Sequence, residues 1–189
     1  MERIILASGS PRRRQLLEWA EVAFDVLVKE TEETWPAGLS TAAVPVHIAR
    51  NKALAVKGDV TPGRVILAAD TVVVLKDEII GKPRDREDAV SILSRLAGQR
   101  HEVITGVVLL WGEREIAFAD STAVLFHELD RREIEGYVDR YKPYDKAGAY
   151  AIQEWIGVVG IKGIEGDFYN VMGLPVSRVV RALRMIAQE

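Results

Sequence analysis

Residues 8–14, which read SGSPRRR, are the part of the sequence best equipped for chemistry. They follow a short apolar run at residues 4–7 that is typical of a β-strand. Ser10 before Pro11 predicts a helix start, because the serine oxygen can accept a free backbone N–H and proline supplies the φ of the first helical position. Each arginine in that first turn is unfavourable by about 0.3–1 kcal/mol, since the helix dipole is positive there. We therefore predict a phosphate site at this turn rather than a solvated basic surface.

Asp70 is a second candidate, because it lies inside the most apolar run of the chain. Residues 65–75 read VILAADTVVVL, which predicts a central strand interrupted at Asp70 and Thr71. An unpaired carboxylate is costly to bury, so aspartate is rare in such a run without a partner. Either the strand ends there with Asp70 at its edge, or the carboxylate faces a cleft that contains a cation. The run by itself leaves both arrangements open.

Other charged residues occur at places where a ligand could reach them. Residues 29–35 form a strongly acidic loop that contains Glu33, although a solvated loop is the ordinary interpretation of such a stretch. Lys52 lies on a predicted amphipathic helix over residues 41–56, where a single lysine is usually a surface charge. Lys82 stands between glycine and proline in a turn that leaves it little freedom.

The elements that must position these residues alternate between helix and strand without a regular βαβ repeat after residue 100. Hydrophobic periodicity and capping residues predict helices over residues 11–20, 41–56, 85–96, 130–140 and 175–187. Asp85 is the expected N-cap of the third helix, and Asp130 with Glu133 forms a capping box for the fourth. Apolar runs predict strands over residues 4–7, 24–28, 65–75, 79–80, 102–111, 116–125 and 156–164. This order indicates an α/β (mixed α+β) fold.

Composition limits the class of protein. The chain has 189 residues, 48% of them hydrophobic and 28% charged, which is typical of one soluble globular domain. It contains no cysteine, which excludes disulfides and thiolate zinc sites and fits a reducing cytoplasm. The first apolar run is too short for a signal peptide, so we expect a cytoplasmic protein with no membrane partner. A net charge of −3 argues against a nucleic-acid partner.

The motif LASGSPRRRQLL resembles the opening signature of the Maf family of nucleoside triphosphate pyrophosphatases. The segments ADT, GKP, DKAGAYAIQ and GDFYNVMGLP resemble its later motifs in the same order, and the resemblance extends from Ile4 to about Leu183. It implies a single Maf-like domain over residues 1–189, with a curved mixed sheet and flanking helices. In this Maf/ITPase-like arrangement, two lobes enclose a central cleft that holds the active site. A homodimer is compatible with it.

The resemblance also assigns roles to individual residues. Asp70 is the implied catalytic residue, and Glu33 and Asp70 are the implied metal ligands. The residues implied to bind the substrate phosphates are Ser8, Arg12, Arg13, Lys52 and Lys82. The residues implied to select the substrate are Arg12, Thr71 and Gln153. The three histidines lack the spacing of zinc ligands, so we expect Mg²⁺ or Mn²⁺ bound through oxygen.

The implied reaction is hydrolysis between the α and β phosphates, which gives a nucleoside monophosphate and pyrophosphate. ADT together with Gln153 in AIQ resembles the branch that acts on dTTP and UTP, with CTP or modified pyrimidine nucleotides as further substrates. A glutamine amide offers one donor and one acceptor, which match N3–H and a carbonyl of uracil or thymine, although a flipped amide would pair with cytosine. The implied role is house-cleaning of the nucleotide pool, with a link to septum formation or cell-division arrest.

Asp70 could orient or deprotonate the attacking water, ligate the metal, or do both. Glu154 follows Gln153 where related sequences more often have glycine, which affects the shape of that loop. The alternative functions are a nucleic-acid-binding regulator that uses the helix start at Arg12 to Arg14, and a phosphatase for small phosphorylated metabolites, which would release orthophosphate.

Overall fold

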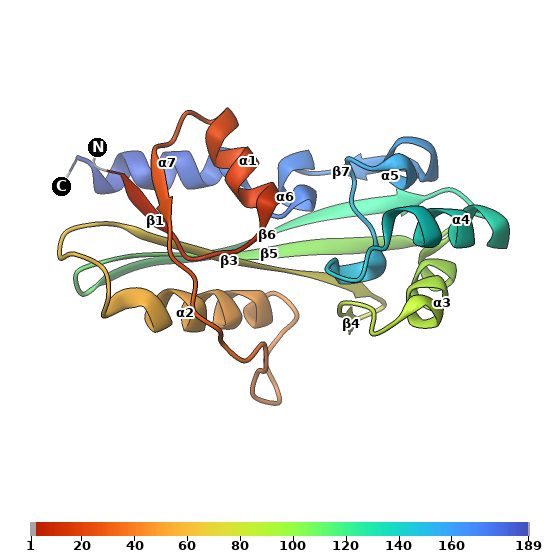
Figure 1. Ribbon diagram of the computed structural model, residues 1–189, viewed down its shortest axis with the longest axis horizontal. Coiled ribbons are helices and arrows are strands. Elements are labelled where there is room, and N and C mark those ends of the chain that lie inside the picture. Colours follow the sequence, from red (N-terminus) through yellow and green to blue (C-terminus); the bar gives the residue numbers. More distant parts are fainter. Residues whose placement is uncertain (1–2, 189) are drawn as a thin grey trace. The chain divides into compact units, whose positions relative to one another are not determined.

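The computed structural model describes residues 3–188, which form a mixed α/β fold around a seven-stranded sheet (Figure 1). The strands are β1 (Ile4–Leu6), β2 (Phe24–Val26), β3 (Ile66–Leu75), β4 (Glu78–Ile80), β5 (Arg100–Trp111), β6 (Arg114–Phe126) and β7 (Ile161–Glu165). Their order in the sheet is β2-β1-β3-β5-β6-β7, and β4 pairs with β3. β1 is parallel to β2 and β3, whereas the β3–β4 and β6–β7 pairs are antiparallel. The predicted mixed sheet is therefore confirmed.

The helices are α1 (Pro11–Trp19), α2 (Ala43–Lys57), α3 (Arg86–Leu96), α4 (Arg131–Tyr141), α5 (Trp155–Gly160), α6 (Phe168–Met172) and α7 (Val176–Ile186), with a 3₁₀ turn at Ala147–Ala149. Five of the helices begin and end within about two residues of the predicted bounds, and two short helices, α5 and α6, were not predicted. Asp85 accepts a hydrogen bond from the Asp88 amide at the start of α3. Asp130 and Glu133 form the predicted capping box of α4. Across the described residues, no helix is both long and apolar enough to cross a membrane.

The chain divides into two compact units, each described here by itself. Within the described chain, the first unit contains residues 3–71, 105–120 and 173–188, and the second contains residues 72–104 and 121–172. β3, β5 and β6 each contribute residues to both units. The arrangement of two lobes around a cleft in one domain stays a prediction.

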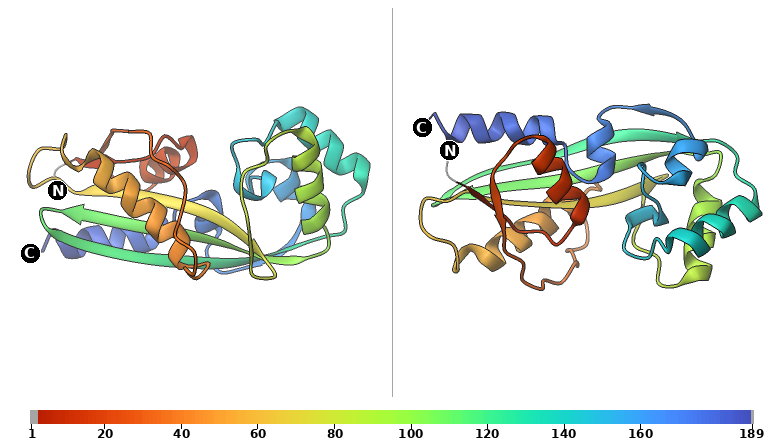
Figure 2. Two further views of the ribbon diagram at one scale, coloured as in Figure 1. Left: turned by 90° about the horizontal axis from the view of Figure 1, so that it is seen from below. Right: turned by 45° about the horizontal axis from the view of Figure 1, so that its top comes forward.

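In the first unit, α2 lies on one face of the strands, and α1 and α7 lie on the other (Figures 1 and 2). Ala49 and Ala53 are one helical turn apart on α2 and are fully buried against Ile5 and Ile66 of the sheet. Two alanines at this spacing allow a helix to pack close to the strands beneath it. Lys52 on α2 and Asp70 on β3 are therefore carried by two elements that pack closely against each other.

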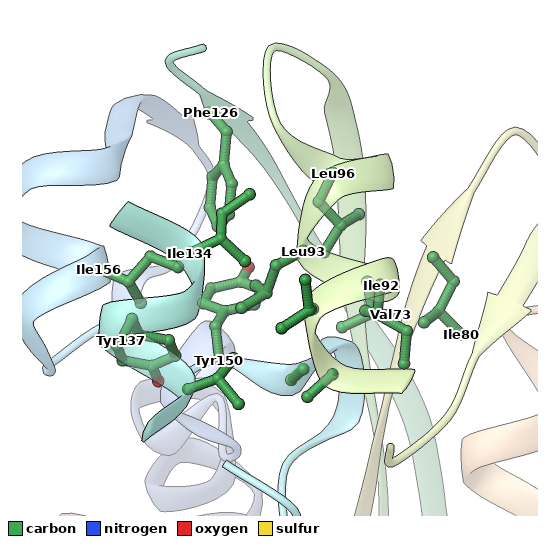
Figure 3. Packing of buried hydrophobic residues seen from close by; sticks show 14 of the residues in the cluster. Val73, Ile80, Ile92, Leu93, Leu96, Phe126, Ile134, Tyr137, Tyr150 and Ile156 are labelled. Atoms are coloured by element: carbon green, nitrogen blue, oxygen red, sulfur yellow. The ribbon is translucent and has the colours of Figure 1, made fainter. Parts of the chain in front are cut away.

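The second unit has its own core, in which α3 and α4 enclose aromatic and aliphatic side chains (Figure 3). Phe126 and Tyr137 are about 1% exposed, and Leu93 and Ile156 are fully buried. His101 is also buried, and its Nε2 lies 2.8 Å from the Tyr150 hydroxyl. Burial lowers the pKa of His101 to about 4, so this imidazole is neutral at pH 7 and acts as part of the core.

The predicted strand over residues 156–164 is wrong in its first half, because that half forms α5. The amides of Gly157 and Val158 both donate to the Glu154 carbonyl, at 2.9 and 3.2 Å, which closes a helical turn. A Cβ on Gly157 would lie 1.8 Å from the Ile152 carbonyl oxygen, so this turn requires glycine. The β-branched residues of the segment favour a strand, but these local contacts override that preference, and β7 begins only at Ile161.

Candidate active site

The loop from β1 to α1 has the structure that its sequence predicts. Ser10 has an extended backbone conformation, and its Oγ accepts a hydrogen bond from the Arg13 amide at 3.5 Å. Pro11 occupies the first position of the helix. The Ser10 amide also lies 3.3 Å from the Ser8 Oγ, so two serines hold the turn in place. The turn therefore gives the arginines that follow it a fixed starting direction.

Arg13 is buried and bonded to protein atoms, which the sequence did not predict. Its Nε donates to the Gly173 carbonyl at 2.7 Å, and its two terminal nitrogens donate to Ser8 Oγ at 3.0 Å and Thr71 Oγ1 at 3.1 Å. Burial lowers the pKa of this guanidinium from its ordinary value, while the negative charge of Asp70 acts in the opposite direction. Three of its five N–H donors are thus used to connect α1, β3 and the segment before α7.

The three arginines of the predicted phosphate site have different surroundings. Arg12 is half-buried, and Arg14 is half-buried with a terminal nitrogen that donates to the Gly9 carbonyl at 3.0 Å. Arg13, Leu16 and Leu17 are the buried residues of α1, and they share one helix face. This spacing of i, i+3 and i+4 is the signal that could have identified Arg13 as an inward-facing residue.

Arg13→Lys is expected to destabilise the folded chain, because lysine cannot bond to three acceptors in a fork. The loss of two charge-assisted hydrogen bonds, at about 1.5–3 kcal/mol each, should cost about 3–6 kcal/mol. In a chain of this size that corresponds to a decrease of roughly 6–24 °C in Tm, measurable by calorimetry. Arg14→Lys is the matched control, since the Arg14 guanidinium donates to the Gly9 carbonyl rather than to the acceptors of Arg13. Equal Tm values for the two variants would contradict the structural role of Arg13.

Lys52 brings together the two carboxylates of the predicted metal site. Its Nζ lies 2.8 Å from Glu33 Oε1 and 2.7 Å from Asp70 Oδ1. Glu33 comes from the loop after β2, Lys52 from α2 and Asp70 from the middle of β3. β3 continues to Leu75, so the alternative in which the strand ends at Asp70 is wrong. Of the other alternative, the structure shows the cation, which is Lys52, while a cleft in front of Asp70 stays a prediction.

The cluster of Glu33, Lys52 and Asp70 extends from solvent into the protein. The side chain of Glu33 is 42% exposed, that of Lys52 is 17% exposed and that of Asp70 is 12% exposed. A small molecule that approaches from solvent would therefore meet Glu33 and Lys52 before Asp70. This order suits a site in which the outer groups bind the ligand and the innermost carboxylate faces the reacting atom.

A hollow of about 250 Å³ lies beside this cluster, within the first unit. Its lining residues come from the end of β1, the acidic loop and α2: Ala7, Ser8, Gly9, Val28, Lys29, Glu30, Thr31, Glu33 and Lys52. Pockets that enclose a whole small-molecule ligand are typically about 300–1,000 Å³. The hollow therefore suits part of a ligand, and its polar lining combines the hydroxyls of Ser8 and Thr31, the ammonium groups of Lys29 and Lys52, and the carboxylates of Glu30 and Glu33.

The donor set of the cluster fits a hard divalent cation. Carboxylate oxygens are the ligands that Mg²⁺ prefers, and Mg²⁺ commonly takes one or two protein carboxylates with water and substrate phosphates as its other ligands. Among the residues that the structure describes, no group of three or more His, Cys, Asp or Glu side chains could hold a metal by itself. Glu33 and Asp70 therefore fit a metal whose remaining ligands come from the substrate.

Two residues assigned to the site from the sequence, Lys82 and Gln153, belong to the second unit. Lys82 is exposed and lies between β4 and α3, where the carbonyl of its neighbour Gly81 accepts a hydrogen bond from the Gly148 amide at 3.1 Å. Gln153 is exposed, whereas Ala151 and Ile152 before it are buried. Each residue therefore lies on a segment that a backbone hydrogen bond holds within the second unit. For Gln153 this bond runs from the Glu154 amide to the Ala151 carbonyl.

Thr105 is a residue that sequence reasoning missed. It is fully buried in β5, and its Oγ1 lies 2.9 Å from Thr71 Oγ1, which also accepts the bond from Arg13. Thr71 was predicted to select the substrate, and its hydroxyl belongs to this network. A hydroxyl inside the apolar run EVITGVVLL was the available signal, since buried polar groups need a partner.

The family profile and the curated relatives match almost the whole chain. The profile of the Maf family, described as Maf-like protein, matches residues 3–186. The dTTP/UTP pyrophosphatase of Cytophaga hutchinsonii is 51% identical over 180 residues, covering 95% of this chain and 82% of that protein. The dTTP/UTP pyrophosphatase of Parabacteroides distasonis is 43% identical over 183 residues, covering 96% and 95%. The solved structure of the Staphylococcus aureus Ham1 protein has 13% identity and a TM-score of 0.47, covering 67% of this chain and 73% of that one.

Proposed function

Because the chain belongs to the Maf family, we propose that it hydrolyses dTTP and UTP to the nucleoside monophosphates and pyrophosphate. Relatives at 43–51% identity over about 95% of the chain are named dTTP/UTP pyrophosphatases. The observation that carries the proposal is the position of Lys52 between two carboxylates, beside a hollow that Ser8 also lines. Such an enzyme has a house-cleaning role, in which it removes nucleoside triphosphates from the nucleotide pool by hydrolysis.

The proposed reaction breaks one P–O bond and forms another. A water oxygen attacks the α phosphorus in line with the bond to the β phosphate, and pyrophosphate leaves with the electrons of that bond. Asp70 orients the water and accepts its proton, since it is the innermost carboxylate of the cluster. Lys52 holds the Asp70 carboxylate at 2.7 Å and would also face the substrate phosphates.

The phosphate chain is bound by hydroxyl, amide and cationic groups in this proposal. Ser8 and the backbone at Gly9 line the hollow, and the positive end of α1 begins two residues later. Arg12 and Lys82 add charge, and Arg13 contributes mainly by holding Ser8 and Thr71 in place. Glu33 and Asp70 would hold Mg²⁺ or Mn²⁺, which neutralises charge on the phosphate oxygens when bound.

Product analysis is the experiment that tests this function. The chain is incubated with dTTP, UTP, CTP and GTP in the presence of Mg²⁺ or Mn²⁺, and pyrophosphate and orthophosphate are measured separately. We expect pyrophosphate and the monophosphate in equal amounts, with dTTP and UTP as the best substrates. Release of orthophosphate without pyrophosphate would identify a phosphatase instead, and the proposal would be abandoned.

Base selection is assigned to Gln153, Thr71 and Arg12. If the Gln153 amide bonds to N3–H and a carbonyl of the base, Gln153→Ala should lower kcat/KM for dTTP and UTP. The expected loss of transition-state binding free energy is about 1–3 kcal/mol per lost contact. The kcat/KM values for poor substrates should fall less, so the differences in kcat/KM between nucleotides should become smaller. Arg12→Ala is the comparison: a loss shared by all triphosphates would assign Arg12 to the phosphates alone. An unchanged ranking in Gln153→Ala would remove Gln153 from the specificity site.

A further inference from the structure

Gln153 lies on a closed turn in the second unit. The Glu154 amide donates to the Ala151 carbonyl at 3.1 Å, which places Gln153 at the third position of a four-residue turn. Ala151 and Ile152 are buried, while Gln153 itself is exposed. The turn therefore presents one polar side chain to its surroundings on a backbone that is packed from behind.

Both ends of this turn bond to one hydroxyl group, that of Tyr137 on α4. The Tyr137 hydroxyl donates to the Glu154 carboxylate and accepts a hydrogen bond from the Ala151 amide at 3.3 Å. Tyr137 is about 1% exposed, and Figure 3 shows its ring packed beside Ile134 and Ile156. Burial and the neighbouring Glu154 raise the pKa of Tyr137, so the hydroxyl keeps the proton that it donates. Tyr137 thus fastens the turn to the core.

Two further contacts restrict the turn. Lys146 is 8% exposed, and its Nζ lies 3.5 Å from Glu154 Oε1, which gives the carboxylate a cationic partner. On the other side, Gly157 lets α5 approach the Ile152 carbonyl more closely than any residue with a Cβ would allow. Glu154, which directly follows Gln153, therefore has three sets of contacts. Its carboxylate bonds to the Tyr137 hydroxyl and pairs with the Lys146 ammonium group, and its carbonyl accepts the first hydrogen bonds of α5.

We propose that Tyr137 and Glu154 are positioning residues that fix the turn carrying Gln153 and thereby set the discrimination between bases. The inference rests on the proposed function, because it assumes that the Gln153 amide reads the base. An amide that forms paired hydrogen bonds must be held within about 0.5 Å and 10–20° of the productive geometry. A misplacement of about 1 Å can lower a rate by roughly 100-fold. Glu154 supplies the carboxylate that this arrangement needs.

Tyr137→Phe tests the inference, because it removes the hydroxyl and keeps the ring. We expect the ratio of kcat/KM for UTP to that for CTP to fall about tenfold, mainly through KM for UTP. Tyr150→Phe is the matched control: Tyr150 is also buried in the same unit, at 6% exposure, but its hydroxyl lies against His101 rather than the turn. We expect Tyr150→Phe to lower Tm to a similar extent and to leave the UTP/CTP ratio unchanged.

Substitutions of Glu154 provide a second measurement that does not depend on Tyr137. Glu154→Gln keeps an oxygen that can accept the tyrosine proton, so most of the discrimination should remain. Glu154→Gly removes the acceptor and should lower the UTP/CTP ratio to that of Tyr137→Phe. Equal ratios for Glu154→Gln, Glu154→Gly and the parent chain would overturn the inference.

The double variant Gln153→Ala/Tyr137→Phe separates this inference from the proposed function. If Tyr137 acts through Gln153, its substitution should not change the ratio further once Gln153 is absent. A parent chain that releases no pyrophosphate refutes the proposed function, and Gln153→Ala with unchanged ranking refutes base reading by Gln153. A changed ranking in Gln153→Ala together with an unchanged ratio in Tyr137→Phe refutes the positioning role alone.

Discussion

Asp70→Asn is expected to lower kcat for dTTP by about 10²–10⁴-fold while the chain stays folded. Asparagine has the same shape as aspartate, but it carries no charge and cannot accept the proton of the attacking water. The folded state should tolerate the change, because Lys52 keeps Glu33 as a counter-ion at 2.8 Å when the charge at position 70 is lost. The measurement is steady-state hydrolysis of dTTP beside a thermal unfolding curve.

Asp25→Asn is the matched control for this substitution. Asp25 is also a strand carboxylate of the first unit, and it pairs with Arg3 and Arg64 instead of the Lys52 cluster. Its substitution should leave kcat unchanged, which would show that the loss at Asp70 is local. Retention of most of the activity by Asp70→Asn would make Asp70 a structural partner of Lys52 and would remove it from the mechanism.

Removal of divalent metal is expected to abolish turnover, and addition of Mg²⁺ or Mn²⁺ should restore it fully. The chain has no cysteine, and its candidate ligands are the carboxylates of Glu33 and Asp70. Such an oxygen site exchanges its metal readily and needs phosphate oxygens to complete its ligands. The measurement is pyrophosphate release in excess chelator, followed by titration with each metal. Undiminished turnover in excess chelator would exclude the metal role of Glu33.

Glu33→Gln tests the metal role of this carboxylate directly. It should change the concentration of metal that activity requires, and not only the maximal rate. The concentration of Mg²⁺ for half-maximal activity should rise by roughly 10–100-fold, as is typical when a metal site loses a supporting group. Glu32→Gln is the control, since Glu32 is adjacent in the same loop but is not paired with Lys52. An identical metal dependence in the two variants would assign Glu33 to substrate binding alone.

Most helices and strands were predictable because their signals are local. Serine, aspartate and proline at the helix starts determine α1, α3 and α4 through contacts within four residues. The apolar run at β3 marks a buried strand, because continuous Val, Ile and Leu have few other places in a fold. α5 also depends on local contacts, those to the Glu154 carbonyl and the close approach to Ile152, but the β-branched residues of the segment favour a strand and conceal that signal.

The sequence predicted which residue types the candidate site contains, but not which of them form ion pairs and hydrogen bonds with one another. The sequence indicated that Asp70 needs a cation, and the structure identifies that cation as Lys52. Charge alone could not separate Arg13 from Arg12 and Arg14, because all three share one helical turn. What distinguishes Arg13 is a set of acceptors on Ser8, Thr71 and Gly173, and no local pattern brings these together.

The bond between Arg13 and Gly173 has a consequence for how the protein is made. The two residues are 160 positions apart, so a growing chain presents its arginine turn long before the acceptor carbonyl has been synthesised. All residues of the second unit precede Gly173, and its core can form first. The first unit can therefore complete its core only after the second unit has been synthesised, since α7, which contributes the buried Val179 and Leu183, follows every residue of the second unit. Nascent chains should acquire protease resistance in the reverse of the usual order, with the second unit protected before the first.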